Sequence, residues 1–236
     1  MTDQTLPPPA DCDLRGMIDH TLLTPEATAA QVDAHLREAL DLGVGAVCIR
    51  PTLIPADAYG LRVVTVCGFP SGAHDPRVKA LEAELALARG ADDIDMVVDL
   101  GAVASHDWAA VRRDIDAVRA VVPSEKTLKV IIESAALSED EIIRCSEIGA
   151  EAGVDHIKTS TGYHPAGGAS VSDVALIARI VGPRVGVKAS GGIRTRAQAM
   201  ALLNAGASRL GVSSTRALLV DAAADAATVG GGAVSY

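Results

Sequence analysis

The sequence predicts a single-domain (β/α)8 barrel, the TIM-barrel architecture, from three observations. Eight short apolar runs rich in β-branched residues alternate with segments that carry helix signals. The 236 residues match the usual size of this fold, about 250. Only five residues are aromatic, so the core must consist of Ala, Val, Leu and Ile, which suits helices packed on parallel strands.

The predicted strands are short and mostly apolar, and several end in polar residues. They cover residues 16–23, 46–50, 62–69, 93–100, 127–134, 155–160, 185–190 and 209–214. A doubly wound sheet is the main alternative. It would carry a glycine-rich fingerprint after its first strand, and the stretch DLGVGAV lacks the third glycine of that fingerprint.

Capping signals mark four predicted helix starts. TPE at 24–26 and Asp75 before a proline provide a cap and a proline at the first helical position. Ser138 with Glu141 forms a capping box, and Thr195 precedes another helix that ends at glycine. The helix after Asp75 carries an apolar stripe, which a helix normally turns toward the core. This stripe consists of Val78, Leu81, Leu85 and Ala88.

We expect the barrel to span residues 16–220, after an N-terminal extension over residues 1–15. A tail over residues 221–236, ending in Tyr236, is expected to be flexible because it contains three consecutive glycines.

The net charge of −9 argues against nucleic acid or an anionic membrane as the main partner. No stretch approaches the roughly 20 apolar residues that span a bilayer, and no signal peptide is recognisable. The four cysteines have neither CxxC pairing nor metal-ligand spacing, as is typical of reduced thiols. We therefore expect a cytoplasmic protein.

Two lysines give the sharpest chemical signal. The chain has few lysines, yet Lys158 and Lys188 lie at the ends of the sixth and seventh strands, which are neighbours in a barrel. A lysine can lose its proton, whereas an arginine cannot. A second ammonium ~5 Å away, at an effective dielectric of ~20, lowers the lysine pKa by roughly two units, and burial lowers it further. Either lysine could then form a Schiff base with a carbonyl, and spacing does not decide between them.

Asp95 is the natural group for proton transfer, because it lies inside an apolar strand. The alternative for Asp95 is an ion pair with one of the lysines. Asp92 and Asp93 are expected to form a solvated loop face, and Lys129 is expected to balance charge.

Phosphate binding is indicated after the seventh and eighth strands. The segments KASGGIRT and LGVSSTRA place Gly191, Gly192, Ser213 and Ser214 before predicted helix N-termini, where backbone amides bind anions. The six histidines form no HxH or HExxH motif, so no metal or other cofactor is expected.

Eight motifs in order carry a family resemblance. IDHTLL, AVCIRP, GFPSG, GADDIDMVVDLG, LKVIIES, HIKTSTGY, GVKASGGIRT and RLGVSS resemble the deoxyribose-phosphate aldolase family from about residue 16 to residue 216, and the final tyrosine also matches. The resemblance implies a class I aldolase on a TIM barrel. Members reversibly cleave 2-deoxy-D-ribose 5-phosphate to D-glyceraldehyde 3-phosphate and acetaldehyde, and are typically homodimers or homotetramers.

The resemblance also implies residue roles. Lys158 is the Schiff-base lysine, Lys188 lowers its pKa and takes part in proton transfer, and Asp95 transfers protons through a water. The accessory residues implied are Asp19, Lys129, Thr159 and Tyr236. The phosphate-binding residues implied are Gly162, Gly191, Gly192, Ser213 and Ser214.

Three departures from the family pattern concern Arg50, where a neutral residue is common, the 163–169 loop, and Asp99, where Asn is common. Two other functions stay open. One is another phosphate-binding barrel, either a different Schiff-base aldolase or an isomerase without a covalent step. The other is a barrel that has lost catalysis and serves as a binding protein.

Overall fold

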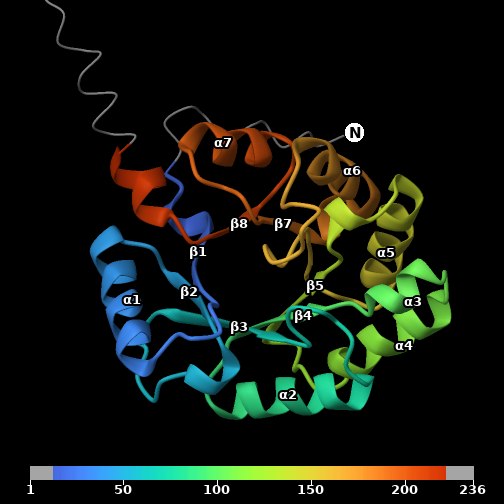
Figure 1. Cartoon of the computed structure of the whole chain (residues 1–236), viewed down its shortest axis with the longest axis horizontal. Helices are drawn as coiled ribbons and strands as arrows, with labels where there is room; N and C mark the ends of the chain where they lie inside the picture. Colours follow the sequence, from blue (N-terminus) through green and yellow to red (C-terminus); the bar gives the residue numbers. More distant parts are fainter. Residues whose placement is uncertain (1–12, 222–236) are drawn as a thin grey trace, which may run out of the picture.

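The computed structural model describes residues 13–221, which form a closed barrel of eight parallel strands in sequence order (Figure 1). The strands are β1 (Ile18–Leu22), β2 (Ala46–Ile49), β3 (Arg62–Cys67), β4 (Asp93–Val97), β5 (Thr127–Ile131), β6 (His156–Lys158), β7 (Gly186–Ser190) and β8 (Arg209–Val212). The predicted TIM barrel and all eight predicted strands are confirmed. Each strand is shorter than predicted, because its terminal residues already belong to the loops.

Seven α-helices within residues 13–221 form a ring around the strands (Figure 1). They are α1 (Ala29–Leu42), α2 (Pro76–Ala88), α3 (Leu100–Ala104), α4 (Trp108–Arg119), α5 (Glu139–Glu151), α6 (Val171–Val181) and α7 (Arg196–Asn204). Short 3-10 turns lie at Arg15–Met17, Pro51–Leu53, Ser134–Ala136 and Gly182–Arg184, and a π-helical turn, Ala217–Asp221, follows β8. None of the helices in residues 13–221 is long and apolar enough to cross a membrane.

Three of the four predicted helix starts are confirmed. Asp75, Ser138 and Thr195 are the N-caps of α2, α5 and α7. The prediction for α1 was wrong. Residues 24–26 lie in a turn, and the helix begins only after Thr28, whose side chain forms a capping box with Gln31. The reciprocal hydrogen bonds of that box satisfy more free amides than the earlier cap would have done.

The apolar stripe of α2 faces outward, against expectation. Val78, Leu81 and Leu85 are each at least half exposed. The face toward the barrel instead carries Ala83 and Ala86, both fully buried. A contact with α4 is consistent with this orientation of α2. The buried Lys79 on the inner face of α2 donates a hydrogen bond to Asp114 of α4 at 2.7 Å.

The core has two parts. The main core packs the outer faces of the strands against the helices. A smaller cluster consists of Leu23, Ala46, Cys48, Val64, Val66 and, partly buried, Phe69. By strand alternation the β2 and β3 members of this cluster face the barrel interior. Inside the barrel, the buried charged side chains come instead from β1 and from β4 to β7, and these side chains build the site.

Candidate active site

Three lysines meet at one buried aspartate. Asp95 Oδ2 accepts hydrogen bonds from Lys158 Nζ at 2.8 Å and from Lys188 Nζ at 2.7 Å, and Asp95 Oδ1 accepts one from Lys129 Nζ at 2.9 Å. All four side chains are at most 4 % exposed. The Asp95 carboxylate is therefore the centre of a buried ionic cluster.

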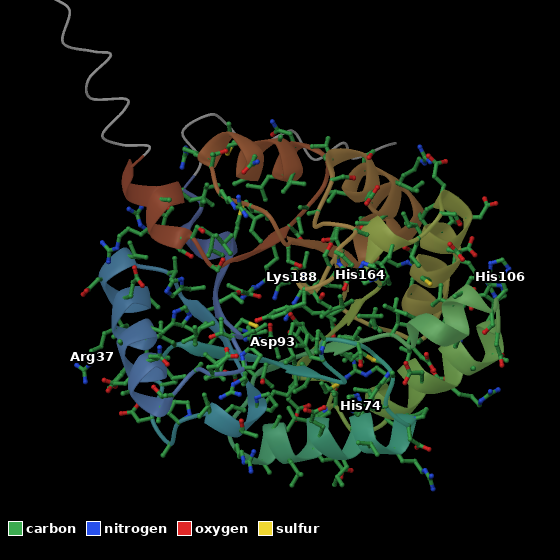
Figure 2. The ribbon with its side chains drawn as sticks, in the orientation of Figure 1. Arg37, His74, Asp93, His106, His164 and Lys188 are labelled. Atoms are coloured by element: carbon green, nitrogen blue, oxygen red, sulfur yellow. The ribbon has the colours of Figure 1, made fainter. Side chains whose placement is uncertain are left out.

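Strand register explains this meeting. Asp95 on β4 is paired with Lys129 on β5, and Lys158 on β6 is paired with Lys188 on β7. Side chains of paired residues in parallel strands point to the same face of the sheet, here the barrel interior. Figure 2 shows Lys188 within the ring of strands, whereas Arg37 and His106 lie at the periphery.

The lysines differ in how many carboxylates surround them. Lys188 also donates to Asp19 Oδ2, and Lys129 also donates to Asp93 Oδ2 at 2.6 Å. Lys158 is paired with Asp95 alone among the carboxylates of residues 13–221. This asymmetry separates two lysines that sequence spacing could not distinguish.

The electrostatic consequence follows from these contacts. Burial lowers the pKa of the Lys158 amine, and the Lys188 ammonium lowers it further against the opposing pull of Asp95. For Lys188 burial is outweighed, because Asp19 and Asp95 raise its pKa above the ordinary value. Despite burial, the lysines hold the pKa of Asp95 well below its usual range. Lys158 is thus the amine prepared to lose its proton, while Lys188 stays charged.

Two arginines lie at the outer ends of the cluster, where each contacts an aspartate other than Asp95. Arg62 Nε donates to Asp93 Oδ1 at 2.7 Å, and Arg209 Nε donates to Asp19 Oδ1 at 2.7 Å. The expectation of a solvated Asp93 was wrong, since its side chain is 1 % exposed and lies inside the barrel (Figure 2). Asp93 precedes Asp95 by two residues, so strand alternation turns both inward. Arg62 and Arg209 were missed, although the same alternation on β3 and β8 could have found them.

A cavity of about 420 Å³ opens above the cluster. Lys158 lines it, together with all five glycines and serines predicted to bind phosphate. Its lining residues are His20, Thr21, Leu22, Leu23, Thr24, His35, Glu38, Lys158, Thr161, Gly162, Tyr163, Ser190, Gly191, Gly192, Ile193, Arg194, Gly211, Ser213 and Ser214. The structure therefore brings the predicted Schiff-base lysine and the predicted phosphate residues to one cavity.

Thr159 lies apart from that lining. Its hydroxyl donates to the Ser190 carbonyl at 3.3 Å and accepts from the Ser190 amide at 3.1 Å, which joins the ends of β6 and β7. Arg50 also has a structural contact, because its guanidinium donates to the carbonyls of Pro25 and Ala27. Tyr236 lies outside the described residues.

The loop after β6 is held by a buried acid. The Glu133 carboxylate accepts from the Thr161 hydroxyl at 2.6 Å and from the Thr161 amide at 3.2 Å. Glu133 itself has a left-handed backbone, with φ at 58°. Thr161 precedes Gly162, so Glu133 fixes the backbone that faces the cavity.

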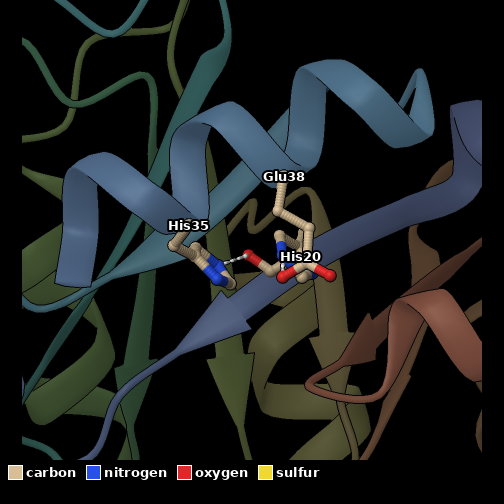
Figure 3. A group of neighbouring side chains, drawn as sticks. All are labelled: His20, His35 and Glu38. Carbon is tan, nitrogen blue, oxygen red and sulfur yellow. Dashed lines mark hydrogen bonds and ion pairs between the residues drawn. The ribbon is translucent and has the colours of Figure 1, made fainter.

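A second polar group, His20, His35 and Glu38, borders the cavity between β1 and α1 (Figure 3). The two imidazole rings are stacked, with centroids 3.7 Å apart and planes 12° from parallel. His20 Nδ1 is 2.8 Å from the Thr215 hydroxyl, and His35 Nε2 is 3.0 Å from the His20 carbonyl. The ligand atoms of the three residues lie within 4.8 Å of one another, and both histidines already have hydrogen-bond partners within the protein. The group links α1 to the loop after β8.

Comparisons with known proteins identify related aldolases. Residues 16–220 match the model of the DeoC/LacD family aldolases. A deoxyribose-phosphate aldolase of Kocuria rhizophila is 54% identical over 208 residues, which cover 88% of this chain and 95% of that protein. The solved structure of QR15, an aldolase, is 34% identical with a TM-score of 0.86, and covers 92% of this chain and 99% of its own.

A second solved structure is the tetrameric deoxyribose phosphate aldolase of Aeropyrum pernix. It is 33% identical with a TM-score of 0.80, and the match covers 87% of this chain and 89% of that one. The chain therefore belongs to the DeoC/LacD family of aldolases.

Proposed function

We propose that the chain reversibly cleaves 2-deoxy-D-ribose 5-phosphate to D-glyceraldehyde 3-phosphate and acetaldehyde, through a Schiff base on Lys158. One observation carries the assignment of the nucleophile. Of the three lysines around Asp95, Lys158 alone opens into the cavity and lacks a second carboxylate. Similarity to the deoxyribose-phosphate aldolase of Kocuria rhizophila supports the substrate.

The first step is attack of the neutral Lys158 amine on the C1 aldehyde of the open-chain sugar. A carbinolamine forms, and its hydroxyl takes up one proton, proposed to come from Lys188, and leaves as water to give a protonated imine. The imine draws electrons from the C2–C3 bond. Lys188 is kept charged between Asp19 and Asp95, and its positive charge favours the neutral form of the Lys158 amine before the attack on the aldehyde.

The second step breaks the C2–C3 bond. The C3 hydroxyl loses its proton and becomes the aldehyde of D-glyceraldehyde 3-phosphate, while the electron pair of the broken bond forms an enamine on Lys158. Asp95 takes that proton through a water, since its carboxylate lies 2.8 Å from the reacting nitrogen. Protonation of the enamine at C2 and addition of one water then release acetaldehyde and restore the lysine.

The substrate phosphate is proposed to lie on Gly162, Gly191, Gly192, Ser213 and Ser214. Support comes from their common position at the cavity edge with Lys158. Gly162, Gly191 and Gly192 all have positive φ, a backbone conformation that other residues rarely adopt and that can turn amides toward an anion. The proposed reaction needs no metal or other cofactor.

The accessory residues have distinct proposed roles. Asp19 and Lys129 keep the charges of Lys188 and Asp95 in place through the contacts described above. Thr159 holds the strands that carry Lys158 and Lys188 together. Tyr236 is proposed to assist protonation of the enamine, and this role rests on the family resemblance alone.

We also propose that the enzyme acts in the cytoplasm as a homodimer or homotetramer. The Aeropyrum pernix enzyme is a tetramer, and the exposed apolar face of α2 is compatible with association. Light scattering at micromolar concentration measures the assembly directly.

The decisive experiment is reduction with borohydride in the presence of 2-deoxy-D-ribose 5-phosphate, followed by peptide mass mapping. We expect loss of activity and a single modified lysine, Lys158. Lys158→Leu should abolish both activity and trapping, and Lys126→Leu, whose partly exposed amine is paired with Asp92, should change neither. An isomerase without a covalent step, or a barrel that only binds sugar phosphates, would not be trapped. Modification of Lys188 instead would overturn the assignment.

A further inference from the structure

The ionic cluster around Asp95 has two arms of the same composition. In one arm Asp95 is followed by Lys129, Asp93 and Arg62. In the other it is followed by Lys188, Asp19 and Arg209. Each arm therefore alternates in charge and ends in an arginine.

The charges in this cluster do not balance. Its cationic side chains come from β3, β5, β6, β7 and β8, and its carboxylates come from β1 and β4. The cations are Arg62, Lys129, Lys158, Lys188 and Arg209, and the carboxylates are Asp19, Asp93 and Asp95. With every lysine protonated, five positive charges face three negative ones, and within the cluster only the two arginines reach solvent to a sizeable extent. Loss of one proton from the cluster reduces this excess of positive charge. The proton must come from a lysine, because an arginine stays protonated.

Contacts determine which group loses that proton. Each outer aspartate is shared between one lysine and one arginine, so Lys129 and Lys188 each touch two carboxylates. Lys158 contacts only one carboxylate, that of Asp95, and the oxygen that it contacts also accepts a hydrogen bond from Lys188. Deprotonation of Lys158 thus disturbs the fewest ion pairs.

We propose that Arg209 and Arg62 are positioning residues for this site: their permanent charges maintain the positive excess that makes Lys158 the uncharged amine. The inference deepens the proposed function and rests on it, because it takes Lys158 as the nucleophile. Neither arginine lines the cavity with Lys158, so they act through the charge of the cluster and not by contact with substrate.

The other titratable groups that face Lys158 are neutral at pH 7, so they do not add to the charge of the cluster. Cys48 on β2 faces the amines as a neutral thiol, because burial raises its pKa. Burial lowers the pKa of His156 on β6 to about 4, with a contribution from Lys129 and Arg209, so it is neutral at pH 7. The charged groups that face Lys158 are then the members of the two arms.

The arginines can be changed without leaving a buried carboxylate alone. Without Arg209, Asp19 keeps Lys188, and without Arg62, Asp93 keeps Lys129. Both arginine side chains reach solvent, at 21% and 43% exposed. Their replacement therefore lowers the charge of the cluster by one and preserves each outer lysine–aspartate pair.

The test is the pH dependence of borohydride trapping with acetaldehyde in Arg209→Gln and Arg62→Gln. Removal of a cation favours the protonated form of Lys158, so a higher pH is needed for trapping. For a charge about 10 Å away at an effective dielectric of ~20, we expect the rising limb of trapping against pH to move by about one unit toward higher pH in Arg209→Gln. Arg62→Gln should give a smaller shift of the same sign, because Arg62 is more exposed.

Matched variants separate charge from structure. Arg209→Lys and Arg62→Lys keep the charge and should restore the wild-type limb. Arg37→Gln makes the same charge change on the outer face of α1 (Figure 2) and should leave the limb in place. A double Arg62→Gln, Arg209→Gln variant should show the sum of the two shifts.

Three results would overturn the inference: an unmoved limb in Arg209→Gln, a shift toward lower pH, or an equal shift in Arg37→Gln. Should Arg209→Gln fail to fold, Arg62→Gln alone tests the inference, with the same sign required. Failure of the proposed function looks different, because the wild-type protein would then not be trapped at Lys158 at any pH.

Discussion

Lys158 and Lys188 donate to the same oxygen atom, Oδ2 of Asp95, at 2.8 and 2.7 Å. Their nitrogens are therefore at most 5.5 Å apart, the sum of these two distances. This separation meets the expectation of a second ammonium ~5 Å away. Burial contributes as well, and for Lys158 it is the larger cause of the lowered pKa.

Replacing Lys188 by Met should raise the pKa of Lys158. The cation that disfavours its proton is lost, while Asp19 keeps Arg209 and Asp95 keeps two lysines. We expect cleavage of deoxyribose 5-phosphate at pH 7 to fall by about 10²–10⁴-fold, since the proposed part of Lys188 in proton transfer is also lost. The rising limb of activity against pH should move to higher pH. Lys126→Met is the control, and an unmoved limb would contradict this account.

Asp19 should contribute to acid stability. Despite burial, Lys188, Lys129 and Arg209 lower its pKa from 3.8 to about 2 in the folded protein. Its stabilisation is thus complete above the unfolded value and is lost as the pH falls from about 4 toward 2, by about 2 kcal/mol. Urea unfolding at several pH values measures this. Asp19→Asn should be less stable at pH 6, with a shallower decline below pH 4, and an unchanged slope would count against the ion pair.

Glu133 should control phosphate recognition through the loop after β6. Glu133→Ala removes the acceptor of the Thr161 amide and hydroxyl, so the backbone before Gly162 loses its anchor. A hydrogen bond to a charged group contributes about 1.5–3 kcal/mol, so we expect the KM for deoxyribose 5-phosphate to rise about tenfold or more. Glu133→Gln keeps one acceptor and should be milder. Unphosphorylated deoxyribose is the discriminating substrate, because an equal loss with it would mean general damage to the site.

Residue patterns predicted the barrel because the signals were local. Strand-sized apolar runs and capping boxes fix each element, and eight units leave few alternatives. The placement of Lys158 and Lys188 on neighbouring strands also followed from their positions at strand ends. The choice between Lys158 and Lys188 did not, because it depends on Asp19, which is 169 residues from Lys188 in the chain. The family resemblance indicated Lys158, whereas the contacts give the physical reason.

Other features depended on contacts that sequence patterns do not encode. Asp93 beside Asp92 looked like a solvated pair, yet alternation along β4 turns Asp93 inward to Lys129 and Arg62. The link from His20 to Thr215 joins the first strand of the barrel to the segment that follows the last strand. Only closure of the barrel brings such residues together.

The orientation of helix α2, with its large apolar side chains facing outward, can be tested through its packing. Its barrel side holds Ala83, with 0% exposure, whereas Ala88 on the same helix is exposed. Ala83→Leu should therefore overpack the contact with the barrel and cost about 1–3 kcal/mol of unfolding free energy. Ala88→Leu, the same chemical change, should stay within about 0.5 kcal/mol. Denaturant unfolding of the two variants compares them directly. If Ala88→Leu were the damaging one, α2 would instead turn its row of large apolar side chains toward the barrel, as hydrophobic periodicity alone suggests.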